Sequence, residues 1–197
     1  MSDLVSAATS ARTGLAQNDD ELRGILALQR ATLKSSLSPA EIAEQGFVTL
    51  VHTLDVLRRM HELAPSVVAK SGDTVVGYAL TMLVEARPLV PQLEPMFDEI
   101  ERATWHGAPL ARRRFYVMGQ ICVARAFRAT GLFAALYAEH DARYGDRFDC
   151  LVTEISTSNV RSARAHARVG FEPVACYRHA GDDWSVVARA LSGAAPK

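Results

Sequence analysis

The chain has 197 residues, of which 49% are hydrophobic, and its 22 basic and 22 acidic residues give a formal net charge of zero. This balance is typical of a globular protein and excludes a disordered, fibrous or collagen-like one. A neutral chain has no long-range field that attracts nucleic acid or an anionic membrane surface, so neither is expected as a partner. The length suits one domain over residues 1–197, with a loosely ordered lead-in at 1–11 and a loose tail at 192–197.

The apolar runs, the first residues and the cysteines indicate in which cellular compartment the protein is expected. No apolar run approaches the roughly 18 residues that span a bilayer, and the first residues lack the basic start and hydrophobic stretch of a signal peptide. Cys122, Cys150 and Cys176 are odd in number, widely spaced and set among apolar residues. This pattern predicts reduced, buried thiols, with neither a disulfide framework nor a metal site. We therefore expect a cytoplasmic protein without a metal ion.

The first third of the chain predicts one strand and three helices. A strand is expected at 12–16, and Asn18 then caps a helix whose apolar residues, with Gln29 among them, recur at helical spacing up to Leu33. Residues 38–41 form a capping box with proline at the first helical position, and Gly46 ends that short helix. A third helix is expected at 53–63, before Pro65.

The middle third predicts a hairpin followed by an insertion. Two β-rich runs, 67–69 and 74–80, flank the glycine-containing connection 71–73. Residues 85–114 then become irregular around four prolines. One helix is expected within this insertion, with an apolar face of Leu93, Met96, Phe97 and Ile100.

The last third alternates strands and helices. We expect strands at 115–123, 150–155, 173–177 and 184–190, and helices at 132–144 and 160–169, the second ended by Gly170. The hairpin requires antiparallel pairing, and the strand-helix-strand unit from 115 to 155 requires parallel pairing. The fold class is therefore α/β with a mixed sheet.

The segment between the strand 115–123 and the helix 132–144 has the features of an anion site. It brings backbone amides, Gly131 and two arginines, Arg125 and Arg128, to a helix N-terminus. The first amides of a helix lack internal partners, the helix dipole favours negative charge, and glycine permits close approach of an oxygen. A pyrophosphate would meet all three conditions. The alternative is an ordinary turn with surface arginines.

These residues resemble the acyl-CoA signature of the GNAT superfamily of N-acetyltransferases, a strand and four residues before Arg/Gln-x-x-Gly-x-Gly/Ala. Arg128, Gly131 and Phe133 fall on its three marked positions. Ala129 stands where glycine often follows the arginine, and Phe133 replaces the final small residue.

A second block, residues 159–171, resembles the family's Asn-x-x-Ala/Ser, then usually Tyr four residues on, then Gly-Phe. Asn159, Ser162, Gly170 and Phe171 match in register, and His166 stands at the tyrosine position. Glu154 stands where many members have a glutamate on the preceding strand.

The resemblance implies a mostly antiparallel central sheet flanked by helices, with a V-shaped splay between the parallel strands 115–123 and 150–155. It implies acetyl-CoA as the cofactor. Backbone groups of Ile121, Cys122 and Val123 would bond the pantetheine arm, the amides of Arg128, Ala129, Thr130, Gly131, Leu132 and Phe133 would hold the pyrophosphate, and Asn159 with Ser162 would bond the pantetheine amides. Asparagine is also a good helix N-cap, and both roles are compatible.

The candidate catalytic residues are Glu154 and His166. Glu154 would be the general base for the incoming amine, or a hydrogen-bonding support at a strand end. His166 would be the acid for the departing thiolate, or a packed structural residue. Tyr137, Tyr177 and Tyr116 are alternative acids, and Cys122 is expected in the core and not as a nucleophile. Residues 112–114, three arginines, are either a contact for the cofactor's 3′-phosphate or a solvated loop edge.

The resemblance implies transfer of an acetyl or short acyl group from acetyl-CoA to a primary amine by direct attack in a ternary complex. We expect the amine to belong to a small molecule. The segments 38–63 and 85–114 are expected to build the acceptor pocket, and acidic residues there would suit a cationic amine if they face inward; these are Glu85, Glu94, Asp98, Glu99 and Glu101. Two alternatives stay open, a non-catalytic acyl-CoA sensor of the same fold and a protein or peptide N-acetyltransferase. Whether two copies of the chain form a homodimer is also left open.

Overall fold

A computed structural model describes residues 10–192, apart from the side chain of Ala43. The lead-in expected at 1–11 and the tail expected at 192–197 lie outside the described residues, except for positions 10, 11 and 192. No helix within 10–192 is long and apolar enough to cross a bilayer.

Seven strands form one mixed sheet in the order β1-β2-β3-β6-β7-β9-β8. Their bounds are β1 Arg12–Leu15, β2 Val67–Ser71, β3 Thr74–Met82, β6 Phe115–Val123, β7 Cys150–Ser156, β8 Glu172–His179 and β9 Asp182–Ala190. The one parallel pair in this sheet is β6 with β7, and the other five pairs are antiparallel. The predicted α/β class with a mixed, mostly antiparallel sheet is confirmed.

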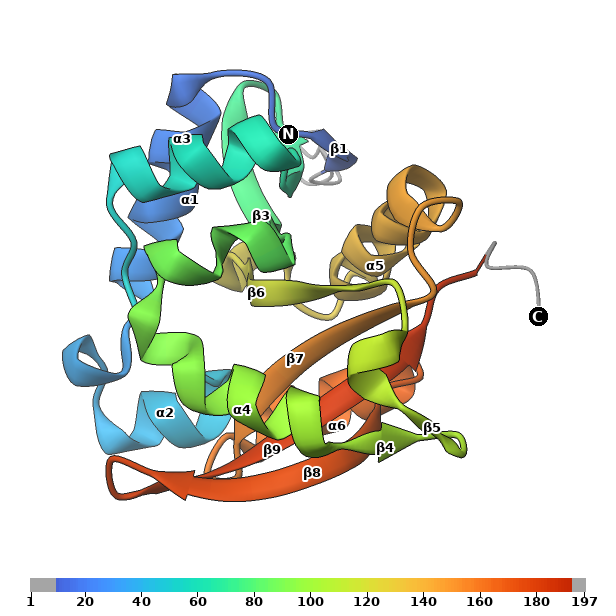
Figure 1. The fold of residues 1–197 in the computed structure, drawn as a ribbon. Helices are drawn as coiled ribbons and strands as arrows, with labels where there is room; N and C mark the ends of the chain where they lie inside the picture. Colours follow the sequence, from blue (N-terminus) through green and yellow to red (C-terminus); the bar gives the residue numbers. More distant parts are fainter. Residues whose placement is uncertain (1–9, 193–197) are drawn as a thin grey trace, which may run out of the picture.

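Residues 10–192 include six α-helices, which are labelled in Figure 1. They are α1 Asp19–Ala31, α2 Pro39–Gln45, α3 Leu54–Leu63, α4 Glu94–Arg102, α5 Leu132–Tyr144 and α6 Val160–Arg168. The two caps predicted from the sequence are present: the Asn18 side chain accepts from the first turn of α1, and Ser38 and Glu41 form the capping box of α2. Thr53, which was expected to begin the third helix, is the N-cap of α3. The prediction for the first helix is wrong at its end, since α1 stops at Ala31 and Leu33 lies beyond it.

The insertion contains more structure than the sequence predicted. Besides α4, it holds the 3-10 helices η2 Val84–Leu89, η3 Pro91–Leu93 and η4 Leu110–Arg112, and a two-stranded hairpin of β4 Thr104–Trp105 with β5 Ala108–Pro109. The strands of that hairpin are too short to leave an alternating pattern in the sequence.

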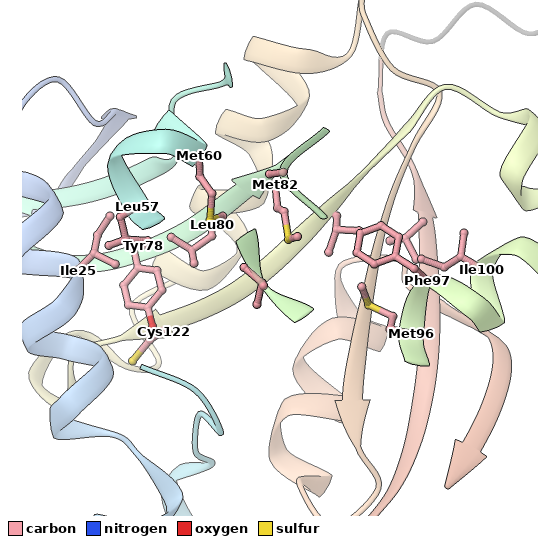
Figure 2. Packing of buried hydrophobic residues seen from close by; sticks show 14 of the residues in the cluster. Ile25, Leu57, Met60, Tyr78, Leu80, Met82, Met96, Phe97, Ile100 and Cys122 are labelled. Atoms are coloured by element: carbon pink, nitrogen blue, oxygen red, sulfur yellow. The ribbon is translucent and has the colours of Figure 1, made fainter. Parts of the chain in front are cut away.

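Side chains of alternate strand residues enter two cores, one on each face of the sheet. On one face, residues of β3 such as Tyr78 and Leu80 meet residues of α1 and α3 such as Ile25 and Met60, as Figure 2 shows. On the other face, α5 packs on the same sheet through residues such as Leu136. The sheet is therefore held rigidly from both sides, and β6 and β7 at its centre are positioned by both cores.

The cysteine prediction is correct for two residues and wrong for the third. Cys122 and Cys150 are buried free thiols, but Cys176 is exposed. Cys176 lies on β8, which is the edge strand of the sheet and is largely uncovered. An apolar neighbourhood in the sequence does not bury a side chain on a strand of this kind.

The two central strands separate like the arms of a V, and we call the opening the fork. Parallel pairing joins residues 115–117 of β6 to residues 150–152 of β7 and does not continue further. Beyond it the strands diverge, as Figure 1 shows. The splay implied by the family resemblance is therefore present.

Candidate active site

A cleft of about 920 Å³ lies beside the end of β6, between the start of α5 and α6. Its walls are the loop between β6 and α5, one face of α6, and the segment at the end of α2. The lining includes Ile121, Cys122, Val123, Arg128, Ala129, Gly131, Leu132, Phe133, Asn159 and Ser162. Thr130 is the one predicted cofactor residue outside this lining, and its hydroxyl donates to the Phe127 carbonyl at 2.7 Å.

The loop before α5 presents backbone amides to the cleft. Ala129 and Gly131 have φ values of 61° and 86°, in the left-handed region. Such a conformation aims successive N–H groups to one side, which forms an anion-binding concavity. The first hydrogen bond of α5 runs from the Ala135 amide to the Gly131 carbonyl at 3.0 Å, so the amides of residues 132–134 have no carbonyl partner within the helix. The loop can therefore bind a phosphate group through its backbone.

The Arg128 side chain braces this loop. Its Nε donates to the Val123 carbonyl at 3.0 Å, and its Nη1 donates to the Gln45 side chain at 3.1 Å. Burial lowers the pKa of Arg128, and the positive charges of Arg161 and Arg125 lower it further. The arginine of the motif thus holds the loop to the end of β6 while it adds positive charge to the cleft.

The free edge of β6 forms the second element of the site. Against β3, the register shifts so that Ala79 pairs with Ile121 and Thr81 pairs with Met118. Between these two pairs β6 has one residue more than β3, which is a β-bulge. A β-bulge increases the local twist and bends the strand away from its neighbour. Past residue 117 the β6 edge toward β7 has no strand partner among the paired residues of the described chain. Such an edge can pair with the amide groups of an extended ligand.

Asn159 lines the cleft and is 7% exposed. Its Oδ1 accepts from the Ser162 amide at 3.2 Å, which caps α6, and its Nδ2 donates to the Phe47 carbonyl at 3.0 Å. The helix-cap reading of this residue is therefore correct. The same side chain also ties α6 to the chain segment that follows α2.

We call residues 44–50 the strap, because they cross the open end of the fork. Arg161 donates to the Glu44 carbonyl at 2.7 Å, and the Val48 amide donates to the Thr32 carbonyl at 3.0 Å. Gln120 of β6 donates to the Leu50 carbonyl at 2.9 Å. The strap is thus bonded to α1, β6 and α6, and it forms one wall of the cleft. Residues 38–63 were expected to build the acceptor pocket, and no local pattern in the sequence predicts these contacts.

A second cavity of about 80 Å³ adjoins the cleft beside β7. Glu154 and His166, the two candidate catalytic residues, both line it. The cleft and the cavity share the lining residues Phe47, Val48, Ile121, Asn159 and Ser162. A molecule that fills the cleft as far as Ile121 therefore reaches the space beside Glu154.

Glu154 has the properties of a proton acceptor near neutral pH. Burial raises the pKa of this carboxyl from the usual 4.5 to about 7, and a hydrogen bond donated by the Tyr177 hydroxyl opposes the rise. A carboxylate with a pKa near the working pH is an efficient general base. Tyr177, on β8, was one of three tyrosines that the sequence could not separate, and the fold brings only this one to the carboxylate.

His166 is held as a neutral, packed side chain. It is 2% exposed, and its Nδ1 lies 2.8 Å from the Ser162 carbonyl, so Nδ1 carries the proton and donates it. Burial lowers its pKa to about 4. The rings of Phe133, Tyr137 and Phe171 surround it with centroid distances of 5.2, 5.7 and 5.1 Å. This environment favours the structural reading of His166 over the role of a proton donor.

Two groups of residues singled out in the sequence lie elsewhere. Arg113 donates to the Trp105 carbonyl, and Arg114 forms an ion pair with Asp149. The acidic residues of the insertion, Glu85 included, line neither cavity. Four of them form local ion pairs: Glu94, Asp98 and Glu101 with Arg87, and Glu99 with Arg102. Tyr116 and Tyr137 are buried in the core. The residues 10–192 contain no cluster of three His, Cys, Asp or Glu side chains that could hold a metal ion.

Comparisons with known proteins bear on the fold. No family model and no curated protein sequence matches the chain. Solved structures do match. The ribosomal-protein-S18-alanine N-acetyltransferase of Escherichia coli has 12% identity and a TM-score of 0.62 over 93% of this chain and 95% of that one.

Two further structures show the same likeness. A GNAT-family acetyltransferase of Streptococcus agalactiae has 14% identity and a TM-score of 0.62 over 92% of this chain and 96% of that one. A chain of the NatC complex, solved with Gag peptide and CoA, has 14% identity and a TM-score of 0.60 over 93% and 99%. Together with the fork between β6 and β7, these likenesses show that the chain has the fold of the GNAT acetyltransferases.

Proposed function

We propose that the protein is an N-acyltransferase that moves an acetyl or short acyl group from acyl-CoA to the primary amine of a small molecule. The observation that carries this proposal is that the phosphate-binding loop and Glu154 face two cavities that meet at Ile121, Asn159 and Ser162. A cofactor held by its pyrophosphate on the loop would extend along the free edge of β6, and its thioester end would lie beside Glu154.

The chemistry follows from these groups. Acyl-CoA supplies an activated carbonyl, to which the amine nitrogen forms a C–N bond as the C–S bond breaks. Glu154 accepts the proton that the amine loses, directly or through a water molecule, and the Tyr177 hydroxyl holds the carboxylate in place. Unpaired amides of β6 in the fork are donors for the negative charge that develops on the carbonyl oxygen.

A small amine is favoured over a protein as the acceptor. The cavity beside Glu154 has about 80 Å³, which admits the amine end of a molecule and little more, since one water molecule takes about 30 Å³ of liquid. A broad acidic groove for a peptide is not supported, because Glu94, Asp98 and Glu101 pair with Arg87 and line neither cavity.

The test is release of free CoA thiol from acetyl-CoA with a panel of amines and short peptides. We expect thiol release with at least one small amine, and a loss of about 100-fold or more in kcat for Glu154→Gln with unchanged binding of acetyl-CoA. Glu62→Gln, at an exposed position of α3, is the matched control and should keep full turnover. Binding of acetyl-CoA without turnover on any amine would support the sensor alternative, and absence of binding would refute the proposal.

A further inference from the structure

Positive charge is concentrated in the wall of the cleft that α6 provides. Arg161, Arg164 and Arg168 follow at helical spacing, and all three line the cleft; we call them the arginine row. Across the cleft lies Arg128, and Glu44 is the one acidic residue in the lining. Four arginines less one glutamate leave a local excess of three positive charges, although the whole chain has a formal net charge of zero.

The charges of the arginine row are not neutralised by ion pairs in the part of the chain that the structure describes. Arg58, Arg87, Arg114 and Arg189 do form ion pairs with carboxylates, whereas the row, like several exposed arginines such as Arg59, does not. Within residues 10–192, the ion pairs include none to Arg161, Arg164 or Arg168. Guanidinium groups that share one helix face, lack carboxylate partners and border a cleft are suited to bind phosphate, whose oxygens match their planar fork of donors.

We propose that the arginine row binds a phosphate monoester at the nucleotide end of the cofactor, the 3′-phosphate of CoA, and so selects CoA over dephospho-CoA. The inference rests on the proposed function. The backbone amides of residues 132–134 account for a pyrophosphate on the opposite wall, and the row extends the positive surface by about 10 Å along α6. A monoester carries nearly two negative charges at neutral pH, whereas the hydroxyl of dephospho-CoA carries none.

The structure disfavours the other candidate for this phosphate. Residues 112–114 were singled out in the sequence as three consecutive arginines. None of them lines the cleft. Arg113 lies with its guanidinium 5.0 Å from the Trp105 ring centroid, and Arg114 lies 2.6 Å from the Asp149 carboxylate. Both guanidinium groups therefore already have partners.

The test measures the affinities of CoA and dephospho-CoA by calorimetry, for the wild type and for the double variant Arg164→Gln/Arg168→Gln. Arg161 is left unchanged because it also bonds the strap. For the wild type we expect CoA to bind about tenfold more tightly than dephospho-CoA. In the double variant CoA should weaken until the ratio is about twofold, with dephospho-CoA nearly unchanged. Arg59→Gln, an exposed arginine of α3, removes one charge outside the cleft and should preserve the ratio.

Each other outcome has a defined meaning. Equal affinity of the wild type for the two nucleotides would refute the arginine row as a 3′-phosphate site and leave the proposed function intact. An equal loss for both nucleotides in the double variant would assign the row to general attraction or to the pyrophosphate, which also refutes the inference. If neither nucleotide binds the wild type, the proposed function fails together with this inference.

Discussion

Replacing Glu154 by glutamine should make the protein more stable at alkaline pH while it removes activity. Burial raises the pKa of this carboxyl from 4.5 to about 7, so the charged form is disfavoured in the folded protein. At about 1.4 kcal/mol for each pKa unit, this rise lowers the unfolding free energy of the wild type by about 3 kcal/mol above pH 7. Glutamine is close in shape, does not ionise, and can still accept the hydrogen bond from Tyr177.

The sign of the effect sets the pH window. Below about pH 4.5 the carboxyl is protonated in both the folded and the unfolded chain, so its ionisation costs the folded protein no stability. Between pH 4.5 and about 7 the folded chain keeps the proton that the unfolded chain releases, so the stability of the wild type falls as the pH rises. The glutamine variant does not undergo this loss. Its advantage should therefore be below about 1 kcal/mol at pH 5 and about 3 kcal/mol at pH 8.

Urea unfolding at pH 5 and pH 8, followed by circular dichroism, measures this difference. For a chain of this size the advantage at pH 8 corresponds to about 6 to 12 °C in Tm. Glu62→Gln, at an exposed position of α3, is the control for a glutamate-to-glutamine change outside the site. An equal difference at both pH values, or a variant that is less stable than the wild type at pH 8, would show that Glu154 is not a desolvated carboxylate.

Three further substitutions test the site. His166→Phe should keep turnover. Burial lowers the pKa of His166 to about 4, so the wild type loses stability as the pH falls below 6.5, and the variant does not. In urea unfolding, the unfolding free energy of the variant relative to the wild type should therefore be about 2 kcal/mol higher at pH 5 than at pH 8. Ala129→Gly should raise the unfolding free energy by about 0.5 kcal/mol in thermal unfolding without weakening CoA binding, because it removes an alanine from the left-handed region. The control is Ala138→Gly on the exposed face of α5, which should lower the unfolding free energy by about 1 kcal/mol. Asn159→Ala should cost about 2 to 4 kcal/mol in urea unfolding through loss of the helix cap and the Phe47 bond, and Asn159→Asp, which keeps the cap, should cost less.

Features encoded within a few neighbouring residues could be predicted from the sequence. The capping box of α2 involves contacts between Ser38 and Glu41, and the hairpin of β2 and β3 follows from a short glycine-containing turn. The bounds of β6 and α5 match the expected 115–123 and 132–144. In each case the signal is a cap, a turn or a period that acts over one or two turns of chain.

Features that depend on distant residues could not be predicted in this way. The strap is fixed by bonds from Asn159 to Phe47 and from Arg128 to Gln45, which join residues more than 80 positions apart. The partner of Glu154 is likewise set by the pairing of β8 with β9 and β9 with β7, which brings Tyr177 beside the carboxylate. No local pattern distinguishes Tyr177 from Tyr116 or Tyr137, because the difference arises only when the sheet assembles.

Two of the three positions at which the chain departs from the GNAT motifs contact each other. Phe133 replaces the small residue that ends the loop signature, His166 replaces the tyrosine, and their ring centroids lie 5.2 Å apart. The large ring helps to enclose the imidazole, and burial lowers the pKa of His166 to about 4, so this side chain has no imidazolium proton to give to a thiolate at neutral pH. A thiol has a pKa of about 8.5 and leaves as its anion without an acid. In the proposed reaction the demanding proton transfer is therefore the one from the amine, and we assign it to Glu154, whose pKa of about 7 suits that task.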